Sequence, residues 1–257
     1  IYSLEEMGNT EYGKNILTLW FTYLQEQGYV SFDQDPMKAN IKNIKAIEVD
    51  SNEITKSPYY NFVGKFIKHG AKLLLGKETV AEAFFMEDKL DLHSFIISQP
   101  GAKEKYEFLN CVLRESSMVN EKSKILILAG DYREELDEVI KVCGNTCAIT
   151  VSSFSIDSLE EMKAGLVECN NIIFSRIREE DLISGAKKVE YNLIISLDFM
   201  HRFHDIPRVL KTLREMLCSE GELIFTESTK NESIELVTTA YLEDGFGKFE
   251  DKRNESL

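Results

Sequence analysis

The chain has 257 residues, of which 43% are hydrophobic and 29% are charged, proportions that are ordinary for a globular protein. Its formal net charge of −14 repels phosphate backbones, so we expect no nucleic-acid partner. The sequence contains no run of about 18 apolar residues and no signal-peptide pattern, so we expect neither a membrane span nor secretion.

Five scattered cysteines argue against a disulfide framework and indicate a reducing, cytoplasmic setting. Cys143 and Cys147 are separated by three residues, which is not the spacing of a zinc knuckle, and no second Cys/His pair completes a site. We therefore expect no bound metal.

The first part of the chain, residues 1–118, has the apolar spacing of helices and predicts a mainly helical subdomain. Residues 35–57 are polar and predict a loop around the strand-like run Ile44–Val49. The three expected helices cover residues 15–27, 59–75 and 103–114, the first two being followed by a glycine.

The second part, residues 119–257, alternates apolar runs with amphipathic segments. Because each apolar run is hydrophobic on both faces, the pattern predicts a doubly wound α/β domain with a mostly parallel sheet covered on both sides. The expected strands are residues 124–129, 147–151, 171–174, 191–197 and 222–226. The expected helices between them are residues 134–142, 158–167 and 207–217.

The region after residue 190 carries a family resemblance. The segment from Tyr191 to His201 resembles the fourth strand of S-adenosylmethionine (SAM)-dependent methyltransferases and the turn after it. The stretch Gly221 to Glu227 resembles their fifth strand. The histidine after strand four and the glutamate ending strand five resemble one subfamily, the carbon-methyltransferase domain of modular polyketide and hybrid nonribosomal peptide synthases.

Two further segments carry the same resemblance. Residues 59–97 are similar to the helical lid that precedes the core in that family, and residues 242–251 are similar to the segment after strand five. The resemblance implies a Rossmann-like methyltransferase sheet with an N-terminal helical lid. It also implies neighbouring synthase domains, and an acyl carrier protein with a phosphopantetheine-bound chain, as partners. The family continues beyond this segment into a strand hairpin, which we expect to be missing here, and the first residue, Ile1, suggests a piece of a longer polypeptide.

The expected cofactor site is degenerate in sequence. The family has a glycine-rich loop after its first strand, where the backbone approaches SAM. Here the run is Ala129-Gly130-Asp131-Tyr132-Arg133, with one glycine followed by two large side chains.

Two acidic positions of the family also lack their acid. The run around Val151, in the second strand, holds no acid for the ribose hydroxyls, and the run around Arg176, in the third, holds none near the adenine. We therefore expect that no cofactor is bound.

The acyl side of the expected site is retained. In the family the histidine acts as general base on the α carbon of the acyl chain and the glutamate orients it, roles that fall on His201 and Glu227. The alternatives are that His201 is a surface or capping residue, that Glu227 is only solvated, or that His204 takes the position of the base.

Four functions remain open from the sequence. The favoured one is a methyltransferase-like domain that does not bind SAM and serves as a structural or docking element of a synthase, a pseudo-methyltransferase. The others are an active carbon methyltransferase acting on a β-ketoacyl carrier protein, a SAM-independent α-proton transferase (epimerase or isomerase), and an unrelated small-molecule-binding domain.

Overall fold

The computed structural model describes residues 8, 10–32, 39–41, 58–87, 94, 98–99, 101–130, 133–143, 147–166, 171–184, 190–227 and 239–242. The chain forms two compact units. Unit 1 comprises Ile1–Gln99 and Lys230–Leu257, and unit 2 comprises Pro100–Thr229. Within the described part of the chain, no helix is long and apolar enough to cross a membrane.

Unit 1 is mainly helical. Its elements are α2 (Glu11–Glu26), the antiparallel strands β1 (Val30–Phe32) and β2 (Ala39–Ile41), α4 (Pro58–Leu74), the π-helical turn η1 (Glu82–Glu87) and α12 (Thr239–Leu242). The Thr10 hydroxyl caps α2 by accepting a hydrogen bond from the Gly13 amide at 2.9 Å. An aromatic core joins α4, η1 and α12, with Phe66, Phe84 and Tyr241 all at most 3% exposed.

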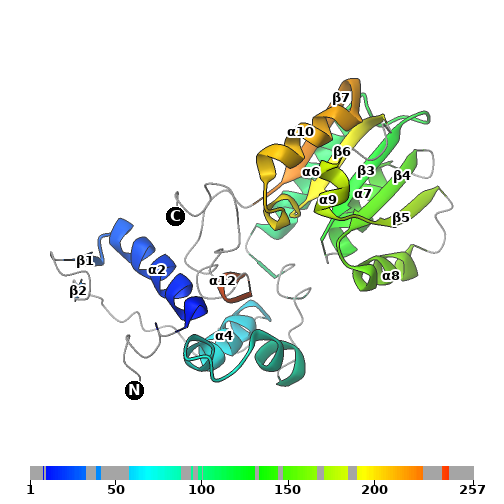
Figure 1. The fold of residues 1–257 in the computed structure, drawn as a ribbon. Coiled ribbons are helices and arrows are strands. Elements are labelled where there is room, and N and C mark those ends of the chain that lie inside the picture. The colour runs from blue at the N-terminus through cyan, green and yellow to red at the C-terminus, as the bar shows by residue number, and fades with distance from the viewer. Residues whose placement is uncertain are drawn as a thin grey trace. The chain divides into compact units, whose positions relative to one another are not determined.

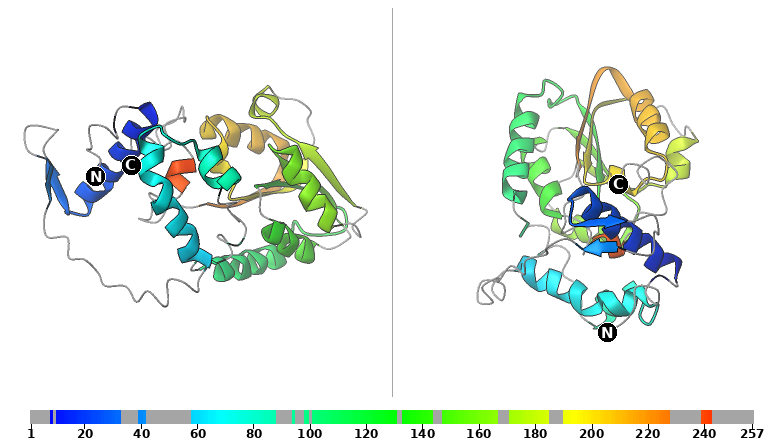
Figure 2. Two further views of the ribbon diagram at one scale, coloured as in Figure 1. Left: turned by 90° about the horizontal axis from the view of Figure 1, so that it is seen from below. Right: turned by 90° about the vertical axis from the view of Figure 1, so that its left-hand side faces the viewer.

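Unit 2 is built on a five-stranded sheet in which every neighbouring pair of strands is parallel. The strand order is β5-β4-β3-β6-β7, so the chain starts in the middle of the sheet and winds outward in both directions. The strands are β3 (Lys124–Ala129), β4 (Ala148–Ser153), β5 (Ile172–Arg176), β6 (Tyr191–Leu197) and β7 (Leu217–Thr226). The sheet and its flanking helices are visible in Figure 1 and, from two other directions, in Figure 2.

Helices cover both faces of this sheet because alternate residues of each strand point to opposite sides. On β3, Ile125 and Ile127 pack with α6 (Ala102–Glu115), α7 (Arg133–Cys143) and α8 (Ile156–Gly165). Leu126 and Leu128 of the same strand pack with α9 (Glu179–Ile183) and α10 (Ile206–Met216) on the other face. The predicted doubly wound parallel fold, with a helical N-terminal part, is confirmed.

Three boundaries differ from those expected. Helix α6 belongs to unit 2, not to the helical subdomain predicted for residues 1–118, because Leu109 and Leu113 lie in the core beneath the sheet. Strand β7 begins at Leu217, five residues before the expected start, with a register irregularity against β6. Part of the predicted loop 35–57 is strand β2, whereas Ile44–Val49 lies outside the described residues.

Candidate functional site

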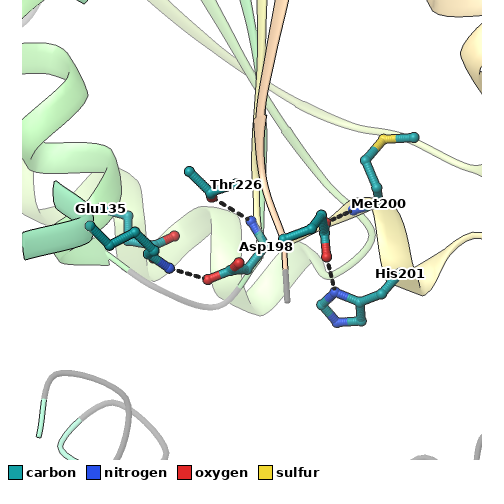
Figure 3. Close-up of polar contacts among 7 residues, drawn as sticks. Glu135, Asp198, Met200, His201 and Thr226 are labelled. Carbon is teal, nitrogen blue, oxygen red and sulfur yellow. Dashed lines mark hydrogen bonds and ion pairs between the residues drawn. The ribbon is translucent and has the colours of Figure 1, made fainter. Parts of the chain in front are cut away.

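The carboxyl ends of the parallel strands lie on one edge of the sheet, where doubly wound domains bind their ligands. Strands β3, β6 and β7 are neighbours there, and the residues that follow them are Gly130, Asp198 and Glu227. Figure 3 shows Asp198 at this edge, with Glu135 on one side of it and Met200 and His201 on the other.

The two residues predicted as a catalytic pair are in contact. His201 lies in a short 3-10 turn, η2 (Met200–Arg202), and its Nδ1 is 2.9 Å from Oε2 of Glu227 (Figure 3). The Met200 amide donates to Oε1 of Glu227 at 2.5 Å, so both carboxylate oxygens are engaged and the carboxylate is fixed. The Glu227 side chain is 13% exposed and that of His201 is 42% exposed, so the pair has a buried acceptor and an imidazole that reaches solvent.

This arrangement has a chemical consequence for the imidazole. A carboxylate at Nδ1 favours the tautomer in which Nδ1 carries the hydrogen and Nε2 carries the lone pair. Nε2 is then the atom that accepts a proton, and Glu227 stabilises the resulting imidazolium.

A second charged cluster, not predicted from the sequence, lies at the same edge of the sheet. Lys105 of α6 places its Nζ 2.7 Å from Oε1 of Glu135 on α7 and also donates a hydrogen bond to Oδ2 of Asp198. Glu135 is 1% exposed, so its carboxylate is inside the protein. Asp198 has a positive φ of 43°, an uncommon backbone conformation for a residue other than glycine, and the Thr226 carbonyl accepts a hydrogen bond from its amide at 3.0 Å.

The charges of this cluster shift the pKa values of Glu135 and Lys105. Burial, reinforced by the negative charge of Asp198, raises the pKa of Glu135 to about 7, although Lys105 acts in the opposite direction. Burial disfavours the charged form of Lys105, but the two carboxylates outweigh it and raise its pKa above the ordinary value. Lys105 therefore stays charged at neutral pH, while Glu135 is close to its titration midpoint.

The expected cofactor positions fall at different places along their strands. Ala129 ends β3 and is fully buried with Gly130, whereas Asp131 and Tyr132 lie outside the described residues. Val151 is not at the end of β4, because the strand continues to Ser153 and Val151 is part of the core.

The strand ends of β4 and β5 carry no acid. Ser153, which ends β4, is fully buried, and no residue in the described part of the chain is hydrogen-bonded to its hydroxyl. Arg176 ends β5 and is exposed, and its Nε donates to the Phe154 carbonyl at 3.1 Å.

The histidine considered as an alternative base is engaged elsewhere. His204 Nδ1 lies 2.8 Å from Oε2 of Glu179, and the same carboxylate accepts hydrogen bonds from the amides of His204 and Asp205. Burial opposes the charge of Glu179, but these hydrogen bonds outweigh it and lower its pKa. Glu179 therefore holds the turn before α10.

Comparison with known proteins places this geometry in a structural context. No protein-family model and no curated protein sequence matches the chain. Among solved structures, the CurJ carbon methyltransferase is similar over 95% of this chain and 68% of its own, with a TM-score of 0.73 and 13% identity. The DszA carbon methyltransferase is similar over 96% and 68%, with a TM-score of 0.73 and 15% identity.

A third similar structure is the CMeT domain of the citrinin polyketide synthase, which matches 93% of this chain and 67% of its own with a TM-score of 0.72 and 14% identity. The chain has the carbon-methyltransferase fold. At these identities the likeness shows the fold alone. A more distant match, with a TM-score of 0.56, is the trans-methyltransferase CalH in complex with SAH.

On this carbon-methyltransferase fold, sequence reasoning found the His201–Glu227 pair through its motif but missed the Lys105–Glu135–Asp198 cluster. Lys105 and Asp198 are 93 positions apart, and Lys105 is one of two lysines on an amphipathic helix. Asp198 was part of a quoted motif, but no pattern in the chain indicates its partner.

Proposed function

We propose that this domain has the carbon-methyltransferase fold of a synthase but does not bind SAM, and that it serves a polyketide or hybrid synthase as a pseudo-methyltransferase. The observation that carries the proposal is the chemistry at the ends of β4 and β5. A ligand with ribose hydroxyls needs an acceptor there, and these strands end in Ser153 and Arg176.

Nearby acids do not replace the missing acceptors. Asp157 lies in the first turn of α8, beyond the Ser155 side chain that caps this helix. Glu179 already accepts hydrogen bonds from the turn before α10. Glu179 is therefore committed to the turn before α10, and Asp157 lies at the start of α8 rather than at the end of β4.

Isothermal titration calorimetry with SAM and with its demethylated product tests this proposal. The full chain is expected to give no heat of binding at ligand concentrations up to about 1 mM, whereas an active carbon methyltransferase of the same fold, run in parallel, gives a saturable isotherm. Micromolar binding of either ligand to this chain would overturn the proposal.

The His201–Glu227 geometry supports a second candidate, SAM-independent proton transfer on a carrier-bound acyl chain. The α hydrogen of a β-ketoacyl thioester is acidic because the resulting enolate is delocalised. Nε2 of His201 takes this proton, the C–H bonding pair enters the enolate, and the imidazolium returns the proton to the same carbon. The reaction is balanced without any other reactant, and return to the opposite face inverts the α carbon.

Deuterium exchange tests this candidate. The chain is incubated in D2O with a 2-methyl-3-ketoacyl carrier protein, and mass gain at the α carbon is followed against the uncatalysed rate. The His201→Ala variant lacks the base, so its exchange rate above the uncatalysed rate is expected to be roughly 100-fold lower than that of the wild type. The control is His204→Ala, which leaves the His201–Glu227 contact in place. Exchange that is no faster than the uncatalysed reaction, or that survives His201→Ala, contradicts proton transfer.

A further inference from the structure

The Lys105 ammonium lies between two carboxylates at the ligand-binding edge of the unit 2 sheet. It reaches Glu135 on α7 and Asp198 after β6, and thereby joins three elements. The side chain of Lys105 is 33% exposed, compared with 22% for Asp198 and 1% for Glu135. The positive group therefore reaches the carboxylates from the more exposed side.

The two carboxylates of this cluster favour a positively charged group between them over a negatively charged one. When both carboxylates are ionised, as they are above the raised pKa of Glu135, the cluster with its one ammonium carries a net charge of −1 and repels an anionic group. Glu135 is 1% exposed, and its carboxylate accepts hydrogen bonds from the Lys105 ammonium and the Tyr106 hydroxyl. A buried carboxylate is costly unless a positive hydrogen-bond donor stands beside it. Lys105 supplies that donor from within the chain.

We propose that Glu135 and Asp198 form a binding site for a primary ammonium group, and that the Lys105 side chain fills this site as an internal substitute for a ligand. An ammonium carries three N–H donors, which suits two carboxylates held on either side of one nitrogen. The site lies where doubly wound sheets bind ligands, beyond the carboxyl ends of their central strands. The inference rests on the proposed function and deepens it, because SAM carries a primary ammonium that Lys105 would exclude.

Replacing Lys105 empties the site while keeping both carboxylates. The melting temperature of the full-length Lys105→Ala variant is measured in about 100 mM ethylammonium chloride and in tetramethylammonium chloride at equal ionic strength. Both salts supply a monovalent organic cation, but only ethylammonium can donate hydrogen bonds. Ethylammonium is expected to raise the melting temperature of Lys105→Ala by about 4 °C relative to tetramethylammonium.

Three proteins serve as controls. The wild type and Lys103→Ala should each differ between the two salts by less than about 1 °C. Lys103 lies on the same helix, and the ion pair that it forms, at 3.5 Å, is with exposed Glu107. The double variant Lys105→Ala/Glu135→Gln keeps one carboxylate and should lose at least half of the ethylammonium effect. It also lacks the uncompensated buried charge, so it is expected to fold where the single variant does not.

The outcomes separate the possibilities. Folding or stabilisation of Lys105→Ala by ethylammonium alone supports the site. Equal behaviour in the two salts, including failure to fold in both, overturns it, as does an undiminished effect in the double variant. The measurement uses no SAM, so SAM binding by the wild type contradicts the proposed function and leaves the ethylammonium result to decide the inference.

Discussion

Glu135 is a residue whose ionised form is disfavoured by its surroundings. It is 1% exposed, and burial together with the charge of Asp198 raises its pKa to about 7. In the unfolded chain a glutamate titrates near 4.5, so between these two pH values the folded state holds a proton that the unfolded state has released. The stability of the fold therefore falls as the pH rises through this window.

We predict that Glu135→Gln removes this pH dependence. From pH 4.5 to 7 the wild type should lose about 3 kcal/mol of unfolding free energy relative to Glu135→Gln, because about 2.5 pKa units correspond to that energy. Above pH 7 the difference should stay constant. Urea denaturation at half-unit pH intervals measures it. Parallel profiles for the two proteins across the window would show that Glu135 is not the titrating group.

Ser153 is a second buried polar residue at the edge of the sheet where the strands have their carboxyl ends. Its hydroxyl is fully buried at the end of β4, and it has no hydrogen-bond partner among the residues that the structure describes. We predict that Ser153→Ala stabilises the protein by about 1 kcal/mol, because the substitution removes an unpaired buried polar group. Chemical denaturation measures the change. Ser155→Ala is the matched comparison and should destabilise by about 1 kcal/mol, since Ser155 caps α8. A loss of stability in Ser153→Ala would mean that its hydroxyl is used.

At the scale of elements, helix α4 packs closely against Tyr241 of α12 at Gly70, within unit 1. A Cβ at Gly70 would lie 2.7 Å from the hydroxyl oxygen of Tyr241, which is 3% exposed on α12. Gly64 of the same helix has nothing within 4 Å of such a Cβ. An alanine at Gly64 therefore tests helix propensity alone, whereas an alanine at Gly70 tests helix propensity together with packing against Tyr241.

We predict opposite effects for the two substitutions. Gly64→Ala should stabilise the protein by up to about 1 kcal/mol through helix propensity. Gly70→Ala should destabilise it by about 1 kcal/mol, because displacing a packed tyrosine costs more than the propensity gain. Thermal unfolding followed by circular dichroism compares them. If both variants were stabilised equally, the Tyr241 side chain would be able to move away from the new methyl group without loss of stability.

The buried strands were predictable because a strand that is buried on both faces is a continuous run of apolar residues. Strands β3 and β6 are fully or mostly buried, and their apolar runs predicted residues 124–129 and 191–197, the bounds the structure has. The start of β7 was not predictable, because the polar residues Ser219 and Glu220 carry no strand signal. The strand reaches Leu217 because that residue pairs with Tyr191 of β6, and Ser219 and Glu220 lie in the register irregularity before the Leu193–Glu222 pair.

At the scale of the whole molecule, the chain has separate cores in its two units. The aromatic cluster around Phe66 and Phe84 belongs to unit 1, whereas the clusters on the two sheet faces belong to unit 2. Each unit is therefore expected to respond locally to a change in its own core.

We predict that Gly70→Ala speeds amide hydrogen exchange mainly in α2 and α4. Peptides covering β3 and β6 should keep their protection, because they draw their stability from the sheet and its flanking helices. Hydrogen exchange followed by mass spectrometry measures both sets, with Gly64→Ala as the control. Equal loss of protection in the two units would show that they unfold as one.

The amino-acid sequence by itself determined the class of fold and the catalytic candidates. Apolar runs, helical spacing and the positions of His201 and Glu227 are local features, and each can be read without knowing what the chain folds against. Only the tertiary structure decided that β4 ends at Ser153 and that Lys105 joins Glu135 to Asp198. Which charges meet depends on the order of strands in the sheet, and that order is set by the burial of both faces together rather than by any one segment.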